Sequence, residues 1–239
     1  MKPVSIMWAS GVSETESQTV VDTVKGFLTH VYRLCLKAGI VPGPTTIRPF
    51  GTWVIPSMPV GSPYSGTHWY IDSSFDQRLG QVIAPQFLEL VRKEPWQVRS
   101  PHFDVAVIDR DLTDLPEKTV NQQNSDFVLA SVLPGTATVL SVHRLRNLPD
   151  DSQRQRVLKR LVTHNFGHVI GLVSPECQVD VESSGGERHC TNVCAMRHGA
   201  TVEELVTLVE EENKLGVTLC PACRADAIKA VLRLRLTNN

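Results

Sequence analysis

The chain has 239 residues, of which 41% are hydrophobic and 21% are charged, and its formal net charge is −1. This length suffices for one large domain or two smaller ones with a buried core. The net charge near zero argues against a nucleic-acid-binding protein, because most of these have an excess of basic residues. The apolar runs are too short to span a bilayer. The first residues, MKPVSIMWASGVSETES, lack the long apolar stretch of a secretory signal, so we expect a cytoplasmic protein.

The first third of the chain predicts one strand and one long helix. Residues 3–9 are a first strand, and apolar residues recur at helical spacing from about Glu14 to Lys37. Gly39 supplies a stop signal for that helix. Residues 42–68 are rich in Pro, Gly and Ser, which predicts a loop with one short strand around Thr46–Pro49.

The middle of the chain predicts further strands that alternate with helices. A second helix is expected across Gln77–Lys93, with a break or kink at Pro85. Three runs rich in β-branched residues, 103–109, 126–132 and 136–142, predict sheet strands. This alternation favours an α/β sandwich over an all-helical or all-β fold.

A long helix follows, capped by Asp150, Asp151 or Ser152. It carries His164 and His168 in the segment THNFGHVIGL (163–172). Side chains four residues apart project from the same helical face and can hold one ion. Taken alone, an HxxxH pair is a weak signal that more often marks a helix with one buried and one half-exposed histidine; the sequence that follows strengthens the metal interpretation.

The remainder of the chain predicts a polar loop and two more helices. The helical pattern ends after Gly171, where a glycine lets the chain turn away, and residues 172–188 are polar and acidic. A capping box between Thr201 and Glu204 predicts the next helix. The last helix follows Pro221.

Four of the six cysteines fall in the last fifty residues. In a reducing compartment, clustered cysteines favour a metal site over disulfides. Cys190-x3-Cys194 and Cys220-Pro-Ala-Cys223 form two close pairs, and four thiolates satisfy a tetrahedral zinc ion in a closed, structural site. Four unrelated buried cysteines are the alternative.

Together these motifs resemble the archaemetzincins, a metallopeptidase family with the pattern HExxHxxGxxHC, a second cysteine with a methionine two residues on, and a distal CxxC. This chain has HNFGHVIG, then HCTNVCAM, and finally CPAC. The segments IDRDLTD, SDFVLASV and ATVLSVHRLR resemble the family's strands before the zinc helix. The resemblance covers about residues 100–225 and implies a metzincin-like twisted mixed sheet with a zinc-binding active-site helix. It also implies a smaller zinc-stapled C-terminal subdomain, which we place at residues 172–239, after an N-terminal α/β subdomain of residues 1–171.

The resemblance implies two zinc ions and assigns their ligands residue by residue. The catalytic zinc would be held by His164, His168 and His189. The structural zinc would be held by Cys190, Cys194, Cys220 and Cys223. Met196 stands where the family places the methionine of the turn beneath the catalytic metal.

Three departures separate this chain from the family pattern. Asn165 stands at the position of the general-base glutamate, and Ser174 stands where the third histidine is expected. An insertion of fifteen residues relative to the pattern lies between Gly171 and His189, and the first cysteine pair is one residue closer than usual. We choose His189 as the third ligand because it directly precedes Cys190. Its rivals are Glu187 and, with less support, Glu176 and Cys177.

The asparagine bears on the expected activity. In a zinc peptidase the glutamate accepts a proton from water and passes it to the leaving amine, which an amide cannot do, so the loss should cost about 10²- to 10⁴-fold in rate. A carboxylate of the insertion could substitute: Glu176, Asp180, Glu182 or Glu187. A solvated acidic loop is the plainer explanation of these four.

The sequence therefore predicts an archaemetzincin-like zinc hydrolase scaffold that binds a peptide-like substrate, with weak or specialised activity. The rival is a non-catalytic, zinc-dependent peptide-recognition module with the same cleft. A zinc-finger adaptor would explain the four cysteines but would leave the histidine helix without a role, and the near-neutral charge argues against nucleic acid as a partner.

Overall fold

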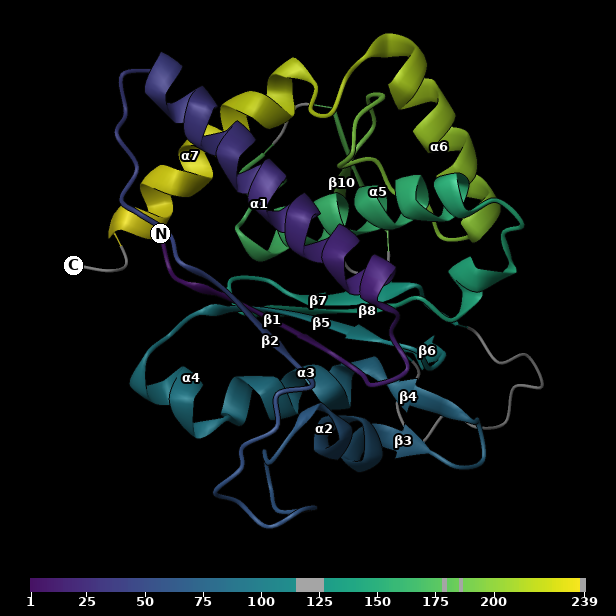
Figure 1. Cartoon of the computed structure of the whole chain (residues 1–239). Helices are drawn as coiled ribbons and strands as arrows, with labels where there is room; N and C mark the ends of the chain where they lie inside the picture. The colour runs from purple at the N-terminus through teal and green to yellow at the C-terminus, as the bar shows by residue number, and fades with distance from the viewer. Residues whose placement is uncertain (115–126, 178–179, 185–186, 237–239) are drawn as a thin grey trace.

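A five-stranded sheet forms the centre of the structure (Figure 1), a computed structural model that describes residues 1–114, 127–177, 180–184 and 187–236. The strand order is β2-β1-β5-β8-β7, where the first four strands are parallel and β7 runs antiparallel at the edge. β5 is buried along its whole length, as expected of a central strand that is covered on both faces. The strands are Val4–Trp8 (β1), Ile47–Gly51 (β2), Phe103–Ile108 (β5), Ala130–Leu133 (β7) and Ala137–Ser141 (β8).

Helices cover both faces of this sheet (Figure 1). On one face, α1 (Glu14–Lys37) packs against α5 (Asp151–Val169) and α7 (Pro221–Leu236). On the other face lie three shorter helices, α2 (Thr67–Ser74), α3 (Ala84–Lys93) and α4 (Pro95–Arg99). The first strand, the first helix and the strands near residues 47, 103 and 137 are confirmed. The predicted strand 126–132 corresponds to β7, although residue 126 lies outside the described part of the chain.

The region around Pro85 differs from the prediction. Residues 77–93 do not form one kinked helix, because β3 (Phe75–Asp76) and β4 (Gln81–Ile83) pair with each other and β4 pairs with β6 (Leu112–Thr113). The helix starts only at Ala84, and Pro85 occupies its first turn. A proline there loses no helical hydrogen bond and is already in a helical conformation. Pro85 therefore begins the helix instead of breaking it.

α5 has a defined start and a defined end. The carboxylate of Asp150 accepts hydrogen bonds from the backbone N–H groups of Ser152 and Gln153, which confirms one of the three predicted caps. The second half of the helix is fully buried, including both histidines. Gly171 has φ +92°, a conformation that favours glycine, so the chain turns sharply just after the helix ends.

The polar stretch after Gly171 contains a β-hairpin. β9 (Val181–Ser184) pairs antiparallel with β10 (Glu187–Cys190), so our prediction of an irregular loop was wrong there. The two strands are short, and only the end of β10 is buried, so the sequence shows no clear alternation. This hairpin delivers His189 and Cys190 to the side of α5 that carries the other histidines.

The C-terminal part contains two helices, α6 and α7. α6 (Val202–Leu215) begins with the predicted capping box between Thr201 and Glu204. The fold class is confirmed as a mixed α/β structure with a twisted mixed sheet and a cysteine cluster near the C-terminus. The division at residue 171 stays a prediction. In the described part of the chain, every helix is too short or too polar to cross a bilayer.

Candidate metal centres

Three buried imidazoles meet where α5 faces β10. His164 and His168 lie one turn apart on α5 and His189 lies on β10, and a ring nitrogen from each lies within 4.8 Å of the others. The ring centroid of His164 is 4.8 Å from that of His168 and 5.2 Å from that of His189. The structure thus brings together the three side chains that we predicted for the catalytic zinc.

The surroundings of these rings suit a metal ion. Burial lowers the pKa of His164 well below its usual value and that of His168 to about 3, so both rings are neutral, the form that binds metals. Nδ1 of His164 lies 2.9 Å from the carbonyl oxygen of Ala195, which can only accept. Nδ1 therefore carries the proton, and Nε2 keeps its lone pair. Nε2 of His168 is buried without any hydrogen-bond partner, an arrangement that a cation would satisfy.

Asn165 follows the first histidine and is only 6% exposed. Its Nδ2 donates a hydrogen bond of 2.8 Å to the carbonyl oxygen of Leu161, one turn back along α5. The amide is therefore engaged with its own helix. Among the described residues, no carboxylate joins the group of three imidazoles.

Met196 packs directly beneath the histidine helix. A Cβ atom added to Gly167, which lies between the two histidines, would be 2.5 Å from Sδ of Met196 and 3.0 Å from its Cε. Only glycine at position 167 leaves this space, and Met196 fills it completely, with no exposed surface. Met196 therefore contacts the helix between the two histidines, and its role as the turn methionine beneath a metal stays a prediction.

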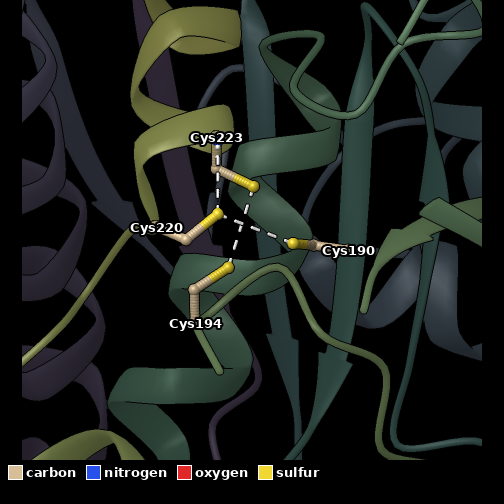
Figure 2. Close-up of side chains that lie close together, drawn as sticks. All are labelled: Cys190, Cys194, Cys220 and Cys223. Atoms are coloured by element: carbon tan, nitrogen blue, oxygen red, sulfur yellow. Dashed lines mark hydrogen bonds between the residues drawn. The ribbon is translucent and has the colours of Figure 1, made fainter. Parts of the chain in front are cut away.

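Four thiols form a second cluster, close to the start of α7 (Figure 2). Sγ of Cys190 is 3.7 Å from Sγ of Cys220, and Sγ of Cys194 is 3.7 Å from Sγ of Cys223. Zinc–sulfur bonds of about 2.3 Å in a tetrahedron place neighbouring sulfurs about 3.8 Å apart, so this spacing fits one zinc ion. Hydrogen bonding among the sulfurs raises the pKa of Cys190 and Cys223 and lowers that of Cys194, so these three thiols do not all ionise without a cation.

Short backbone contacts join the two clusters. His189 and Cys190 are consecutive, and the N–H of Cys190 donates to the carbonyl oxygen of Met196 over 2.9 Å. Ala195, whose carbonyl holds His164, donates its own N–H to the carbonyl of Thr218 over 2.9 Å. The segment from His189 to Met196 therefore contacts both clusters.

Comparisons with known proteins agree with these observations. No family model matches the chain. An archaemetzincin from Archaeoglobus fulgidus is 30% identical over 107 residues, which make up 44% of this chain and 52% of that protein. The chain thus spans about half the length of this curated relative. The crystal structure of the archaemetzincin from Methanopyrus kandleri superposes with a TM-score of 0.55 over 97% of this chain and 96% of that one, at 18% identity, which shows a shared fold. The chain is thus similar to an archaemetzincin in part of its sequence and to another in its fold. The predicted resemblance is confirmed.

Two of the three imidazoles, those of His164 and His189, line a cleft of about 450 Å³. The edge strand β7 and the residues before it form one wall, and the segment after Met196 forms the other. Arg144 supports the first wall, because its guanidinium lies over the ring of Phe127 and makes two hydrogen bonds with Asp111, of 2.8 and 2.6 Å. His164, Asn165 and His189 all line the cleft.

The four carboxylates of the insertion have different surroundings in the structure. Glu187 lines the same cleft as Asn165, and burial together with the charge of Asp114 raises the pKa of Glu187 to about 7. Glu176 is exposed and lies 3.5 Å from Arg233, and Asp180 and Glu182 are exposed as well. Of the residues that we considered for the third ligand position, His189 is the one that joins the other two histidines; Glu187, Glu176 and Cys177 are not in that group.

Two residues near this archaemetzincin-like centre were not predicted. Arg160 lies one turn before His164 and is buried, where it makes a 2.8 Å ion pair with Glu212 and donates to the carbonyl of Arg197 over 2.6 Å. His198 lines the cleft, with its ring 4.5 Å from that of His189. In the sequence, the only indication of a role for Arg160 was its position on the same helix face as His164. Its two partners, Glu212 and the carbonyl of Arg197, come from distant segments.

Proposed function

We propose that this chain is a zinc metallopeptidase-type scaffold that binds a peptide-like ligand in its cleft. The observation that carries this proposal is the cluster of three buried imidazoles, His164, His168 and His189, of which His164 and His189 line a cleft of about 450 Å³. The relationship to the archaemetzincin of Archaeoglobus fulgidus supports zinc as the metal. A second zinc ion, structural in role, belongs to the four-cysteine cluster. The spacing of its sulfurs supports this assignment.

The residues around the cleft have distinct tasks in this proposal. Zinc would supply Lewis-acid polarisation of a peptide carbonyl and activation of water. The carbonyl of Ala195 orients His164, and Met196 packs against α5 at Gly167 and so limits the position of the helix. β7 is a half-buried edge strand in the cleft wall, and such an edge offers backbone hydrogen bonds to an extended peptide.

The position of the general base in this centre is occupied by an amide. The amide of Asn165 cannot accept a proton, and it donates to Leu161 instead. Glu187 is the insertion carboxylate that lines the cleft, and it is therefore our candidate for a substitute base. We infer slow or specialised hydrolysis, and a cytoplasmic location remains part of the proposal.

A non-catalytic peptide-recognition module is the second candidate. The hydrogen bond between Asn165 and Leu161 favours it, because the amide is satisfied within the helix and needs no substrate-derived partner. Absence of a described carboxylate from the imidazole group favours it as well. The two candidates predict the same metal content and differ in turnover.

Metal content tests the scaffold. We expect elemental analysis of the purified chain to give at least one zinc ion, and His168→Ala to contain less zinc than wild type. Lys159→Ala on the same helix is a matched control with an exposed side chain, and it should keep the wild-type content. Less than one zinc ion in the wild type, or an unchanged content in His168→Ala, would contradict the proposal.

Turnover separates the two candidates. We expect wild type at full zinc content to cleave members of a broad peptide library slowly, and Glu187→Gln to reduce that rate at least tenfold. Glu182→Gln, on the paired strand, removes an exposed carboxylate of the same hairpin and should leave the rate unchanged. Peptide binding without cleavage by zinc-loaded wild type would establish the recognition module instead.

A further inference from the structure

A third set of metal-ligating side chains lies on the other face of the central sheet. Glu94 connects α3 to α4, His102 precedes β5, and Asp104 lies within β5. All three are buried, and one ligand atom from each lies within 4.8 Å of the others. Asp104 is the register partner of Ser5 in β1, and both line a small cavity on the side of the sheet that α3 and α4 cover. This cluster is therefore separate from the imidazoles of α5.

The ring of His102 has a fixed orientation. Its Nδ1 lies 2.8 Å from the carbonyl oxygen of Ser100, which can only accept, so Nδ1 carries a proton. Its Nε2 lies 3.3 Å from Oε1 of Glu94 and 3.3 Å from Oδ2 of Asp104. In the neutral ring this nitrogen presents a lone pair to two carboxylate oxygens. The contact is favourable only with a second proton on the ring or with a cation between the three groups.

The distances distinguish these two states. Hydrogen bonds between an imidazolium and a carboxylate are typically about 2.7–2.9 Å long, shorter than both contacts of His102. Metal–nitrogen and metal–oxygen bonds of about 2.0–2.1 Å place neighbouring ligand atoms of a tetrahedron about 3.3–3.4 Å apart. The same relation accounts for the 3.7 Å sulfur spacing in the thiol cluster. The two distances from Nε2 of His102 are those expected between neighbouring ligand atoms of a coordination shell.

The outer contacts orient the two carboxylates and leave their charge unbalanced. Oε2 of Glu94 accepts from the hydroxyl of Tyr70 over 2.6 Å, and Oδ2 of Asp104 accepts from the amide of Gln97 over 2.6 Å. Oε1 of Glu94 is buried and makes no hydrogen bond, although it points at His102. Apart from His102, the described partners of both carboxylates are neutral. Two buried carboxylates carry two negative charges, which a divalent cation balances.

A cavity of about 10 Å³ adjoins the three ligand atoms, with Trp53 and Trp96 among its lining residues. This is about the space that one water molecule occupies. A metal held by three protein ligands needs one further ligand to complete a tetrahedron, and water in this cavity would supply it.

We propose that Glu94, His102 and Asp104 form a third metal site, which binds a divalent cation of the zinc or manganese class. One imidazole and two carboxylates are donors that both ions accept. The site joins the start of α4 to the central strand β5 and is structural in role. It is independent of the proposed peptidase centre, because no residue is shared between them.

Metal stoichiometry is the first test. We expect wild-type protein dialysed against Zn²⁺, and separately against Mn²⁺, to bind one equivalent more than Asp104→Asn does under the same conditions with at least one of these ions. Asp72→Asn removes an exposed carboxylate from α2 and is the matched control, which should retain the wild-type stoichiometry. Equal metal content in wild type and folded Asp104→Asn, for both ions, would overturn the proposal.

A measurement on the unmodified chain covers the case in which the variant does not fold. Anomalous diffraction from wild-type crystals grown with Zn²⁺ or Mn²⁺ should show a peak between Nε2 of His102 and the two carboxylates. The competing state is an imidazolium: although burial opposes it, the carboxylates of Asp104 and Glu94 raise the pKa of His102 to about 10 when no metal is bound. Absence of the peak, with ¹⁵N shifts that show protons on both ring nitrogens of His102 in the presence of metal, would overturn the proposal.

Discussion

Replacement of Asn165 by glutamate tests whether a missing proton acceptor limits this centre. General acid–base assistance contributes about 10²- to 10⁴-fold in rate, or about 2.7–5.4 kcal/mol of barrier at about 1.36 kcal/mol per tenfold. Glu187 already lines the cleft and could supply part of this effect, so the gain should lie towards the lower end. We expect Asn165→Glu to raise kcat/KM at least tenfold at equal zinc content.

The same substitution should carry a cost in stability. It removes the hydrogen bond from Asn165 to Leu161, which contributes about 1 kcal/mol. It also places a carboxylate at a position that is only 6% exposed, which costs about 1–3 kcal/mol without a partner, while the better helix propensity of glutamate offsets a few tenths. The net loss of about 2–4 kcal/mol corresponds to a Tm lower by about 4–16 °C in the metal-free protein. Zinc at the imidazoles should reduce this loss, because the cation attracts the new carboxylate.

The assay compares initial rates of wild type, Asn165→Glu and Asn165→Gln on one quenched-fluorescence peptide library. Glutamine has the length of glutamate and cannot accept a proton, so it separates shape from chemistry. Thermal unfolding of each variant with and without zinc measures the stability terms. Equal gains in the glutamine and glutamate variants would refute the reasoning, as would a fully zinc-loaded glutamate variant that is no faster than wild type.

Three further changes test the structure around the cleft. Cys220→Ser should lower Tm by about 5 °C or more beyond the effect of His164→Ala, because a structural zinc contributes directly to folding; equal effects in thermal unfolding would count against the assignment. Gly167→Ala should destabilise the chain by about 1 kcal/mol or more, since overpacking outweighs the helix propensity of alanine, whereas Gly26→Ala, whose new Cβ meets nothing within 4 Å, should stabilise it by about 0.5–1 kcal/mol in urea unfolding. Burial opposes ionisation of Asp111, but its hydrogen bonds with the guanidinium of Arg144 hold its pKa below the usual value. The ionised carboxylate therefore stabilises the folded chain above about pH 4, and this stabilisation is lost as the pH falls through the lower pKa of the folded state. Asp111→Asn should therefore cost about 1–2 kcal/mol at pH 7 and progressively less in unfolding measured below pH 4; a cost that is independent of pH would contradict this.

The long elements were predictable because their signals are local. α1 combines 24 residues of helical periodicity with the capping pair Ser13 and Glu16, and β5 is a continuous apolar run. The hairpin β9–β10 was missed because two four-residue strands with one buried end show no periodicity. Pro85 was misinterpreted because a proline marks the first turn of a helix as readily as it breaks one.

The candidate site likewise contains features that the sequence predicts and features that depend on packing. The histidine pair on α5 and the two cysteine pairs have characteristic spacings along the chain, so each set could be recognised from the sequence alone. The hydrogen bond of Asn165 to Leu161 and the position of Glu187 in the cleft depend on how helix and hairpin pack, which no spacing encodes. Glu94 lies between α3 and α4, whereas His102 and Asp104 lie just before and within the start of β5; no motif links them, and Glu94 meets the other two only in the folded chain.

The order in which the two metal centres can lose their ions follows from how they are joined. Cys190 directly follows His189, so whatever holds the thiol also limits the position of the imidazole before it. Ala195, in the loop between Cys190 and the helix that follows, supplies the carbonyl that fixes the tautomer of His164. Release of the thiolate-bound ion would free this loop and weaken the imidazole centre, whereas release of the ion at the imidazoles leaves every thiol contact in place. A chelator should therefore remove the imidazole-bound metal first without unfolding, and loss of the thiolate-bound metal should abolish both metal binding at the cleft and the fold around it.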